Sequence, residues 1–351
     1  MKKNTRFAFN AYLQQLARLN GVAVEELSSK FTVEPSVQQT LEDQIQQSAA
    51  FLTLINVTPV TEQSGQLLGL GVGSTIAGTT DTTAKEREPV DPTLMVDVEY
   101  KCEQTNFDTV LTYAKLDLWA KFQDFQVRIR NAMKRQALDR IMIGFNGVKR
   151  AKTSNRSENP LLQDVNKGWL QKIREDAPDH VMGSTTTGGE TTPGAVKVGK
   201  GGEYANLDAV VMDAVNELID VVYQDDDDLV VICGRELLSD KYFPLVNKEQ
   251  ENSEKLAADM IISQKRMGGL QAVRAPFFPP NALLITRLDN LSIYWQEDTR
   301  RRSVIDNPKR DRIENFESVN EAYVVEDYRC AALVENIQIG DFCAAAAETG
   351  A

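Results

Sequence analysis

The first 30 residues carry apolar side chains at helical spacing. Four of them recur at steps of four, three and three: Phe9, Leu13, Leu16 and Leu19. The pattern stops at Asn20 and Gly21, which is typical of a helix end, and it predicts a short amphipathic helix. Residues 1–30 hold five basic side chains against two acidic ones, although the whole chain has a net charge of −12. Both a helix docked on the core and a detachable interaction segment fit this composition.

Between residues 55 and 113 the apolar period changes to two. Apolar and charged residues alternate from Val96 to Glu103, which predicts a strand with one buried face. Ahead of it lie glycines at 69, 71 and 73, a threonine-rich stretch at 77–84 and a charged stretch at 85–88. This composition suits an exposed tip and not a core. We therefore expect a long hairpin arm.

A long helix is predicted next, over residues 116–143. Its packing stripe steps by three or four without an intervening Gly or Pro, and includes Leu118, Phe122, Phe125, Ile129 and Met133. Gly144 and Gly147 close the run, and the helix is about 40 Å long at 1.5 Å per residue. Residues 115–150 hold nine basic and three acidic side chains. A basic helix face of this kind is more often simply exposed to solvent than in contact with nucleic acid, so we favour the solvent-exposed interpretation.

The second half of the chain mixes helices and strands. Residues 183–202 are rich in Gly and Thr, which predicts a surface loop at a domain boundary. Helices are expected at 207–221 and 235–243, on either side of an apolar strand at 229–233. Shorter strands follow at 271–275, 282–286, 291–295, 323–327 and 331–339. The predicted fold class is α+β.

Composition excludes several classes of protein. The 351 residues are 42% hydrophobic and 26% charged, as in a folded chain with more than one packed unit. The acidic balance argues against coating nucleic acid or an anionic membrane. Four cysteines without a CxxC pair and one histidine, His180, give no expected metal site or cofactor. No stretch of about 18 apolar residues predicts a membrane helix.

Catalytic motifs are weak. Gly69, Gly71 and Gly73 resemble part of a dinucleotide fingerprint, but no helix is predicted after them. Residues 73–80 lack the lysine of a P-loop, and residues 225–228, four consecutive aspartates, suit a solvated turn better than a cation site. No nucleophile accompanies a base at usable spacing, so no catalytic residue and no enzyme is expected. Two alternatives remain open: a cytosolic nucleotide-using α/β enzyme, and a structural subunit of a small assembly, such as a tail or baseplate.

Eight short sequence segments, spread along nearly the whole chain, resemble segments of the major capsid proteins of P2-like tailed phages, the peduoviruses. In the first half they are residues 4–13 (NTRFAFNAYL), 30–37 (KFTVEPSV), 116–125 (LDLWAKFQDF) and 144–150 (GFNGVKR). In the second half they are residues 240–249 (DKYFPLVNKE), 256–259 (LAAD), 261–266 (IISQKR) and 323–328 (YVVEDY). Several segments of this length in the same order identify a protein family more specifically than one short catalytic motif does.

This resemblance implies an HK97-like capsid fold and a division of the chain. The implied parts are a removable basic segment at 1–31, an N-terminal arm at 32–65, an E-loop hairpin at 66–93, a peripheral domain at 94–204 and 300–327 with a spine helix at 116–143, and an axial domain at 205–299 and 328–351. It also implies cleavage of the segment near Lys30, Phe31, Thr32 and Val33.

The implied function is that of a major capsid protein. Members of the family form hexamers and pentamers of an icosahedral shell with the help of an internal scaffolding protein, and a prohead protease removes the N-terminal piece. The other implied partners are the portal protein and packaged double-stranded DNA, bound without sequence specificity. The expected location is the virion, after assembly in the host cytoplasm, with no membrane partner.

Overall fold

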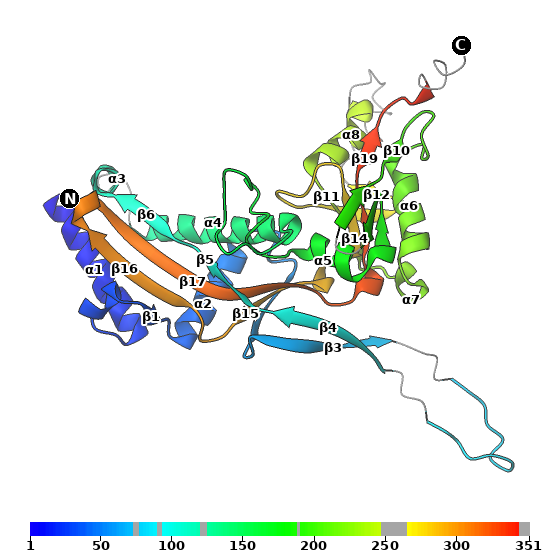
Figure 1. The fold of residues 1–351 in the computed structure, drawn as a ribbon, viewed down its shortest axis with the longest axis horizontal. Coiled ribbons are helices and arrows are strands. Elements are labelled where there is room, and N and C mark those ends of the chain that lie inside the picture. Colours follow the sequence, from blue (N-terminus) through cyan, green and yellow to red (C-terminus); the bar gives the residue numbers. More distant parts are fainter. Residues whose placement is uncertain (73–76, 90–92, 120–124, 188–189, 247–264, 344–351) are drawn as a thin grey trace.

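The computed structural model describes residues 1–72, 77–89, 93–119, 125–187, 190–246 and 265–343. A long curved sheet runs along the longest axis of the molecule, and a second, smaller sheet with its own helices stands at one end of it (Figure 1). A hairpin reaches away from the body below the long sheet in this view. This arrangement confirms the predicted α+β class.

The long sheet has seven strands centred on β17. The members are β1 (Phe31–Thr32), β2 (Asn56–Val60), β5 (Glu103–Asn106), β6 (Thr109–Thr112), β15 (Leu291–Gln296), β16 (Arg301–Asn307) and β17 (Arg312–Val325). One edge of β17 pairs with β16 and then with β15, and its other edge pairs with β6 and then with β5, all antiparallel. The 14 residues of β17 thus hold four strands together.

The N-terminal helix forms as predicted and is docked. Helix α1 (Lys3–Asn20) ends at Gly21, whose φ of 64° is left-handed and suits glycine. Its buried side chains Phe9 and Leu16 pack with Leu116, Val304 and Ile313 at the far end of the long sheet. Leu19, the last residue of the predicted stripe, is exposed. A short turn, η1 (Glu25–Ser28), leads from α1 to β1.

Three further helices flank the long sheet: α2 (Pro35–Gln47), α3 (Tyr113–Trp119) and α4 (Phe125–Asn146). Together α3 and α4 occupy the predicted spine range, with residues 120–124 outside the description. Gly144 does not end the helix as predicted, because α4 continues to Asn146. Gly144 lies inside the helix, where the ring of Trp169 packs against its bare backbone, and Gly147, the second predicted end signal, directly follows the last helical residue.

The smaller sheet has six strands. They are β7 (Val181–Met182), β11 (Leu229–Cys233), β12 (Arg266–Met267), β13 (Leu270–Arg274), β14 (Leu283–Arg287) and β18 (Ala332–Val334). Alternate residues of β11 feed two cores, because Val230 and Ile232 face α4 and α5 (Trp169–Asp176) whereas Val231 and Cys233 face α6 (Leu207–Leu218). A strand that is buried on both faces has a continuous apolar sequence, and β11 confirms the apolar strand predicted at 229–233. Helices α7 (Val221–Gln224) and α8 (Arg235–Val246) complete this part.

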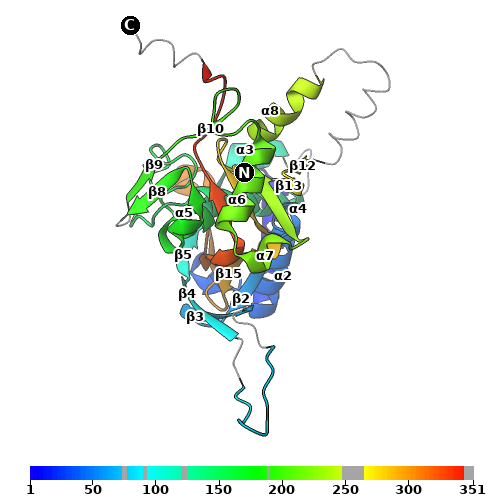
Figure 2. The same ribbon diagram turned by 90° about the vertical axis from the view of Figure 1, so that its right-hand side faces the viewer.

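Strand pairing links segments from different parts of the expected division. Strand β15, within the range 205–299, pairs with β17 of the long sheet. Strand β7 pairs with β18, and β10 (Val196–Val198) pairs with β19 (Ile337–Ile339), so residues 181–204 accompany the smaller sheet. The predicted loop at 183–202 is also structured in part, because β8 (Ser184–Thr187) and β9 (Glu190–Pro193) form a hairpin that projects from the side of this sheet (Figure 2). Backbone pairing, which composition does not reveal, decides these positions.

The remaining short turns are η2 (Pro178–His180), η3 (Leu288–Asn290), η4 (Pro308–Arg310) and η5 (Tyr328–Cys330). None of the helices in the described ranges has the length and apolarity needed to span a bilayer.

Candidate assembly site

The most prominent surface feature is the hairpin of β3 (Ser64–Val72) and β4 (Thr93–Lys101). The strands pair antiparallel over nine residues each, with Gly69 opposite Val96. Residues 77–89 at its far end are all exposed, and a local turn orders them where the Thr83 amide donates to the Asp81 carboxylate at 2.9 Å. The hairpin extends well beyond the body of the chain (Figures 1 and 2). Gly69 and Gly71, placed in the tip by the sequence, belong to the paired strand β3 instead.

The base of the hairpin is held on the long sheet by aromatic packing. The ring of Tyr100 meets Tyr294 of β15 edge to face, with centroids 5.3 Å apart. The Cys102 amide donates to the Gln63 carbonyl at 2.7 Å, and the Cys102 side chain is buried with Ala322 and Val324. Burial raises the pKa of Cys102 to about 12, so this thiol stays protonated and inert at neutral pH.

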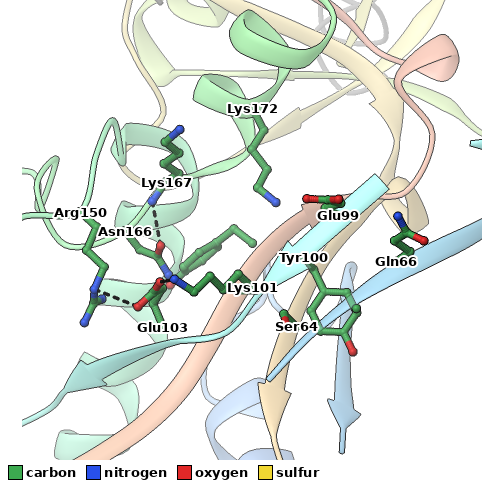
Figure 3. Close-up of a pocket in the computed structure, with 13 residues that line it drawn as sticks. Ser64, Gln66, Glu99, Tyr100, Lys101, Glu103, Arg150, Asn166, Lys167 and Lys172 are labelled. Carbon is green, nitrogen blue, oxygen red and sulfur yellow. Dashed lines mark hydrogen bonds and ion pairs between the residues drawn. The ribbon is translucent and has the colours of Figure 1, made fainter. Parts of the chain in front are cut away.

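A pocket of about 540 Å³ lies between the hairpin base and α5. Lys101 and Arg150 bind Glu103 at 2.7 and 3.4 Å, while Lys172 extends from α5 toward Glu99 (Figure 3). Burial lowers the pKa of Lys172, and the like charge of Lys167 adds to this effect against the attraction of Asp176. The pocket therefore gathers more cations than carboxylates beside the point where the hairpin leaves the body.

A buried network of charges joins the arm, the long helix and the long sheet. Arg140 of α4 binds Glu42 of α2 at 2.6 Å and Glu321 of β17 at 2.5 Å. Arg300 binds the other oxygen of Glu42 and also Glu317 of β17. All five side chains are nearly or fully inaccessible to solvent. Arg140, which the sequence placed on a solvated basic face, therefore belongs to the interior.

Burial and charge act against each other on these carboxylates. Burial alone would raise the pKa of Glu42, but Arg140 and Arg300 outweigh it and lower the value. The pKa of Glu317 is lowered in the same way, mainly by Arg300. The pKa of Glu321 is raised, because burial dominates there and, within the described residues, Arg140 alone forms an ion pair with it. Glu321 is thus the least stably ionised member of the network.

The predicted processing segment lies on the edge of the long sheet. Phe31 and Thr32 form β1 and pair with Arg302 and Arg301 of β16. The Val33 amide donates to the Arg300 carbonyl at 2.9 Å, and its side chain is buried. Lys30 precedes the strand and is exposed. Cleavage at this segment requires β1 to leave the sheet edge.

The predicted packing stripe of the spine helix has a mixed outcome. Met133 packs against the main core, with the buried Ala137 and Ile141 further along the same stripe. Leu118 is 67% exposed, so its predicted packing is wrong within this chain. Leu116 anchors α3 instead, and a residue two positions later points to another side of a helix. Phe122 lies outside the described residues, as do the side chains of Phe125 and Ile129.

The four aspartates at 225–228 form a hydrogen-bonded turn. Asp226 closes the acidic turn by accepting from the Asp228 amide at 2.9 Å, and it binds Arg287 at 3.2 Å. Among the residues described, no three His, Cys, Asp or Glu side chains are grouped to hold a metal ion. Cys102, Cys233 and Cys330 are buried free thiols, and Cys343 is an exposed one.

The structure thus combines an extended hairpin, a docked N-terminal segment and a long helix beside a curved sheet. The model of the family described as "Phage major capsid protein, P2 family" matches residues 8–337. The chain belongs to this family of capsid proteins. It is therefore a phage major capsid protein with the HK97-like fold and a component of the virion.

Capsid proteins of two phages match this chain over nearly its whole length. It is 59% identical to the "Capsid proteins" of Escherichia phage P2, over 100% of both chains. It is 41% identical to the "Major capsid protein" of Serratia phage KSP20, over 96% of this chain and 97% of the relative. A solved chain from the "Satellite phage P4 procapsid including size determination (Sid) protein" matches with a TM-score of 0.79 and 56% identity, over 97% of this chain and 100% of that one. These matches do not favour the nucleotide-using enzyme or the tail subunit.

Proposed function

We propose that this capsid protein assembles with an internal scaffolding protein into hexamers and pentamers that close an icosahedral head around double-stranded DNA. The observation that carries the proposal is the exposed hairpin, whose tip at 77–89 contributes nothing to the cores of its own chain. Arms that lie on neighbours bury large areas without one rigid geometry, so the same chain fits five- and six-membered rings. The portal protein occupies one vertex, and assembly takes place in the host cytoplasm.

The proposed parts follow the family pattern, with boundaries adjusted to strand pairing. The arm at 32–65 contains α2 and β2, and the hairpin of β3 and β4 is the E-loop. The long sheet with α3 and α4 forms the peripheral domain, and the six-stranded sheet with α6 and α8 forms the axial domain. A prohead protease removes residues 1–31 near Lys30 to Val33. The subunit itself has no catalytic turnover.

The negative net charge of the chain is compatible with a shell that encloses DNA without binding it tightly. A net charge of −12 weakens counterion release on DNA, so packaged DNA is not held on the inner wall.

Co-expression of the chain with its scaffolding protein, followed by negative-stain electron microscopy, tests the proposal. Closed particles of uniform diameter are expected. A soluble monomer or dimer with a saturable nucleotide-binding site would overturn it.

A further inference from the structure

Charge is divided very unevenly between two segments of the chain. Residues 201–234 hold nine acidic side chains and no lysine, arginine or histidine, which gives this segment a net charge of −9. Residues 125–156 hold nine basic side chains and one acidic side chain, which gives them a net charge of +8. The two segments are similar in length and nearly opposite in charge, so a surface built from one attracts a surface built from the other.

The acidic segment forms an outer surface of the smaller sheet. It builds α6, α7 and the turn that leads into β11. Glu217, Asp225 and Asp227 are exposed there, and none of the three has an ion pair in the described part of the chain. These three side chains define the acidic surface, whose carboxylates are available to a cationic partner.

The basic segment is exposed at its C-terminal end. Lys134 of α4 and three residues of the segment that follows the helix, Lys149, Lys152 and Arg156, are exposed. Within the described residues, none of these four has an ion pair. They define the basic surface, whose cations are available to an acidic partner.

The two surfaces do not neutralise each other within one subunit, because the six-stranded sheet stands between them. Alternate residues of β11 face α4 and α6. Figure 1 shows α4 on one side of this sheet and α6 and α7 on the other. Across the ranges that the structure describes, no ion pair joins residues 125–156 to residues 201–234. Only a second molecule can therefore bring an acidic surface to the basic one.

We propose that the basic surface of one subunit binds the acidic surface of the next subunit in the shell. Each copy then uses two different surfaces, and a head-to-tail contact of this kind closes into a ring when the rotation permits. Complementary charge steers copies together, and like-charge repulsion disfavours wrong pairings. The near-equal and opposite charges favour a copy of this chain over DNA, which would leave the acidic surface unmatched. The inference rests on the proposed function and names the surfaces through which copies meet.

The test is charge reversal on each surface, with the yield of closed particles measured after co-expression with the scaffolding protein. Asp225→Lys with Asp227→Lys reverses the acidic surface, and Lys149→Glu with Lys152→Glu reverses the basic surface. All four side chains are exposed, so the fold is retained, which urea melts of each variant establish. We expect each reversal to lower the yield about tenfold, because like charges then face each other. The four changes together should restore the yield to within about threefold of the parent, because the pairing is re-formed with opposite signs.

A matched control separates this pairing from net charge. Asp43→Lys with Asp179→Lys changes two exposed residues outside both surfaces and alters the net charge as much as the acidic reversal does. This pair alone should assemble like the parent. Combined with Lys149→Glu and Lys152→Glu, it restores the net charge of the chain but not the pairing, so the yield should stay low.

Three results of this experiment would overturn the inference: parental yield from either reversal, no recovery from the four combined changes, or recovery with the control pair. A basic reversal that assembles normally and instead loses affinity for double-stranded DNA in a filter-binding titration would overturn it as well, because the surface then serves DNA. Particle formation by the parent chain reports on the proposed function separately. If the parent forms no particles, self-association of the same purified variants in sedimentation at low and high salt still decides the pairing.

Discussion

Arg140 and Glu321 form a two-pronged ion pair inside the molecule, with Nε and Nη2 of the arginine 2.8 and 2.5 Å from the same carboxylate oxygen. The other oxygen of Glu321 is buried without a hydrogen-bond partner in the described part of the chain. Arg140 also donates to Glu42 at 2.6 Å, so one side chain of α4 ties α2 to β17. The long helix is thereby fixed to both the arm and the sheet.

Glu42→Gln should destabilise the subunit strongly. Glu42 is the carboxylate shared by Arg140 and Arg300, and its neutralisation leaves both buried guanidinium groups short of a counter-charge. We expect a loss of about 3–5 kcal/mol of unfolding free energy, measured by urea titration. Glu321→Gln should cost clearly less, because burial already disfavours its charge. The exposed control Glu158→Gln should stay within about 0.5 kcal/mol of the parent. Equal losses for Glu42→Gln and Glu158→Gln would contradict this role.

The same carboxylates predict how stability depends on pH. The pKa of Glu42 and of Glu317 is lowered on folding, so their contribution is complete above the unfolded value of about 4.3 and is lost as the pH falls below it. The pKa of Glu321 is raised, so the folded state gains stability as the pH falls toward about 4.3. Urea midpoints between pH 7 and 4.5 should therefore fall more steeply for Glu321→Gln than for the parent. Parallel curves would show that Glu321 stays ionised.

Gly144→Ala should destabilise the core even though alanine favours helices. A Cβ at this position would collide with the ring of Trp169, which is fully buried and packs edge to face with Phe145 and Tyr323. Overpacking of this kind costs about 1–3 kcal/mol, which exceeds the helix propensity gained. Thermal denaturation compares it with Gly78→Ala, where a Cβ meets nothing within 4 Å. A Tm for Gly144→Ala at or above that of the Gly78 variant would show that the contact is loose.

Shortening the hairpin should stop assembly and leave the fold intact. The register pairs Gly69 with Val96, so an Asn-Gly turn joining these two residues closes a shorter hairpin without a slip. Circular dichroism and the melting transition should match the parent, because the core lies elsewhere. Co-expression with the scaffolding protein should yield no closed particles, whereas Thr82→Ala in the exposed tip should assemble normally. Normal shells from the shortened chain would refute the arm assignment.

Chains in mature particles should begin between Lys30 and Val33. Removal of about 31 residues makes the 39.1-kDa chain roughly 3.5 kDa lighter in intact-mass spectrometry. Particles made without the prohead protease should retain the full mass, because nothing then separates β1 from α1. An unprocessed Met1 to Ala351 chain in infectious virions would disprove the processing proposal.

The sequence by itself determined the elements whose burial is local and periodic. The amphipathic stripe of α1 packs one face on a core, and the continuous apolar run of β11 packs two faces on cores, so both elements could be predicted from their spacing. The eight segments that resemble P2-like capsid proteins likewise indicated the fold and the capsid function without any knowledge of tertiary contacts. The hydrophobic stripe of the spine range was less informative at its start, where Leu118 is exposed and Leu116 is buried.

Only the tertiary structure decided the polar interior. Glu317 and Glu321 lie at core-facing positions of β17. Charged residues at such positions interrupt the apolar pattern of a buried strand. The sequence therefore predicted only the end of this strand, from Tyr323 onward. Their burial is possible because Arg140 and Arg300 compensate them. Arg140 is 98 residues from Glu42 and 181 from Glu321 along the chain. No local pattern reports such a pairing, because the cost of burying a charge is offset only by a partner that the fold brings to it.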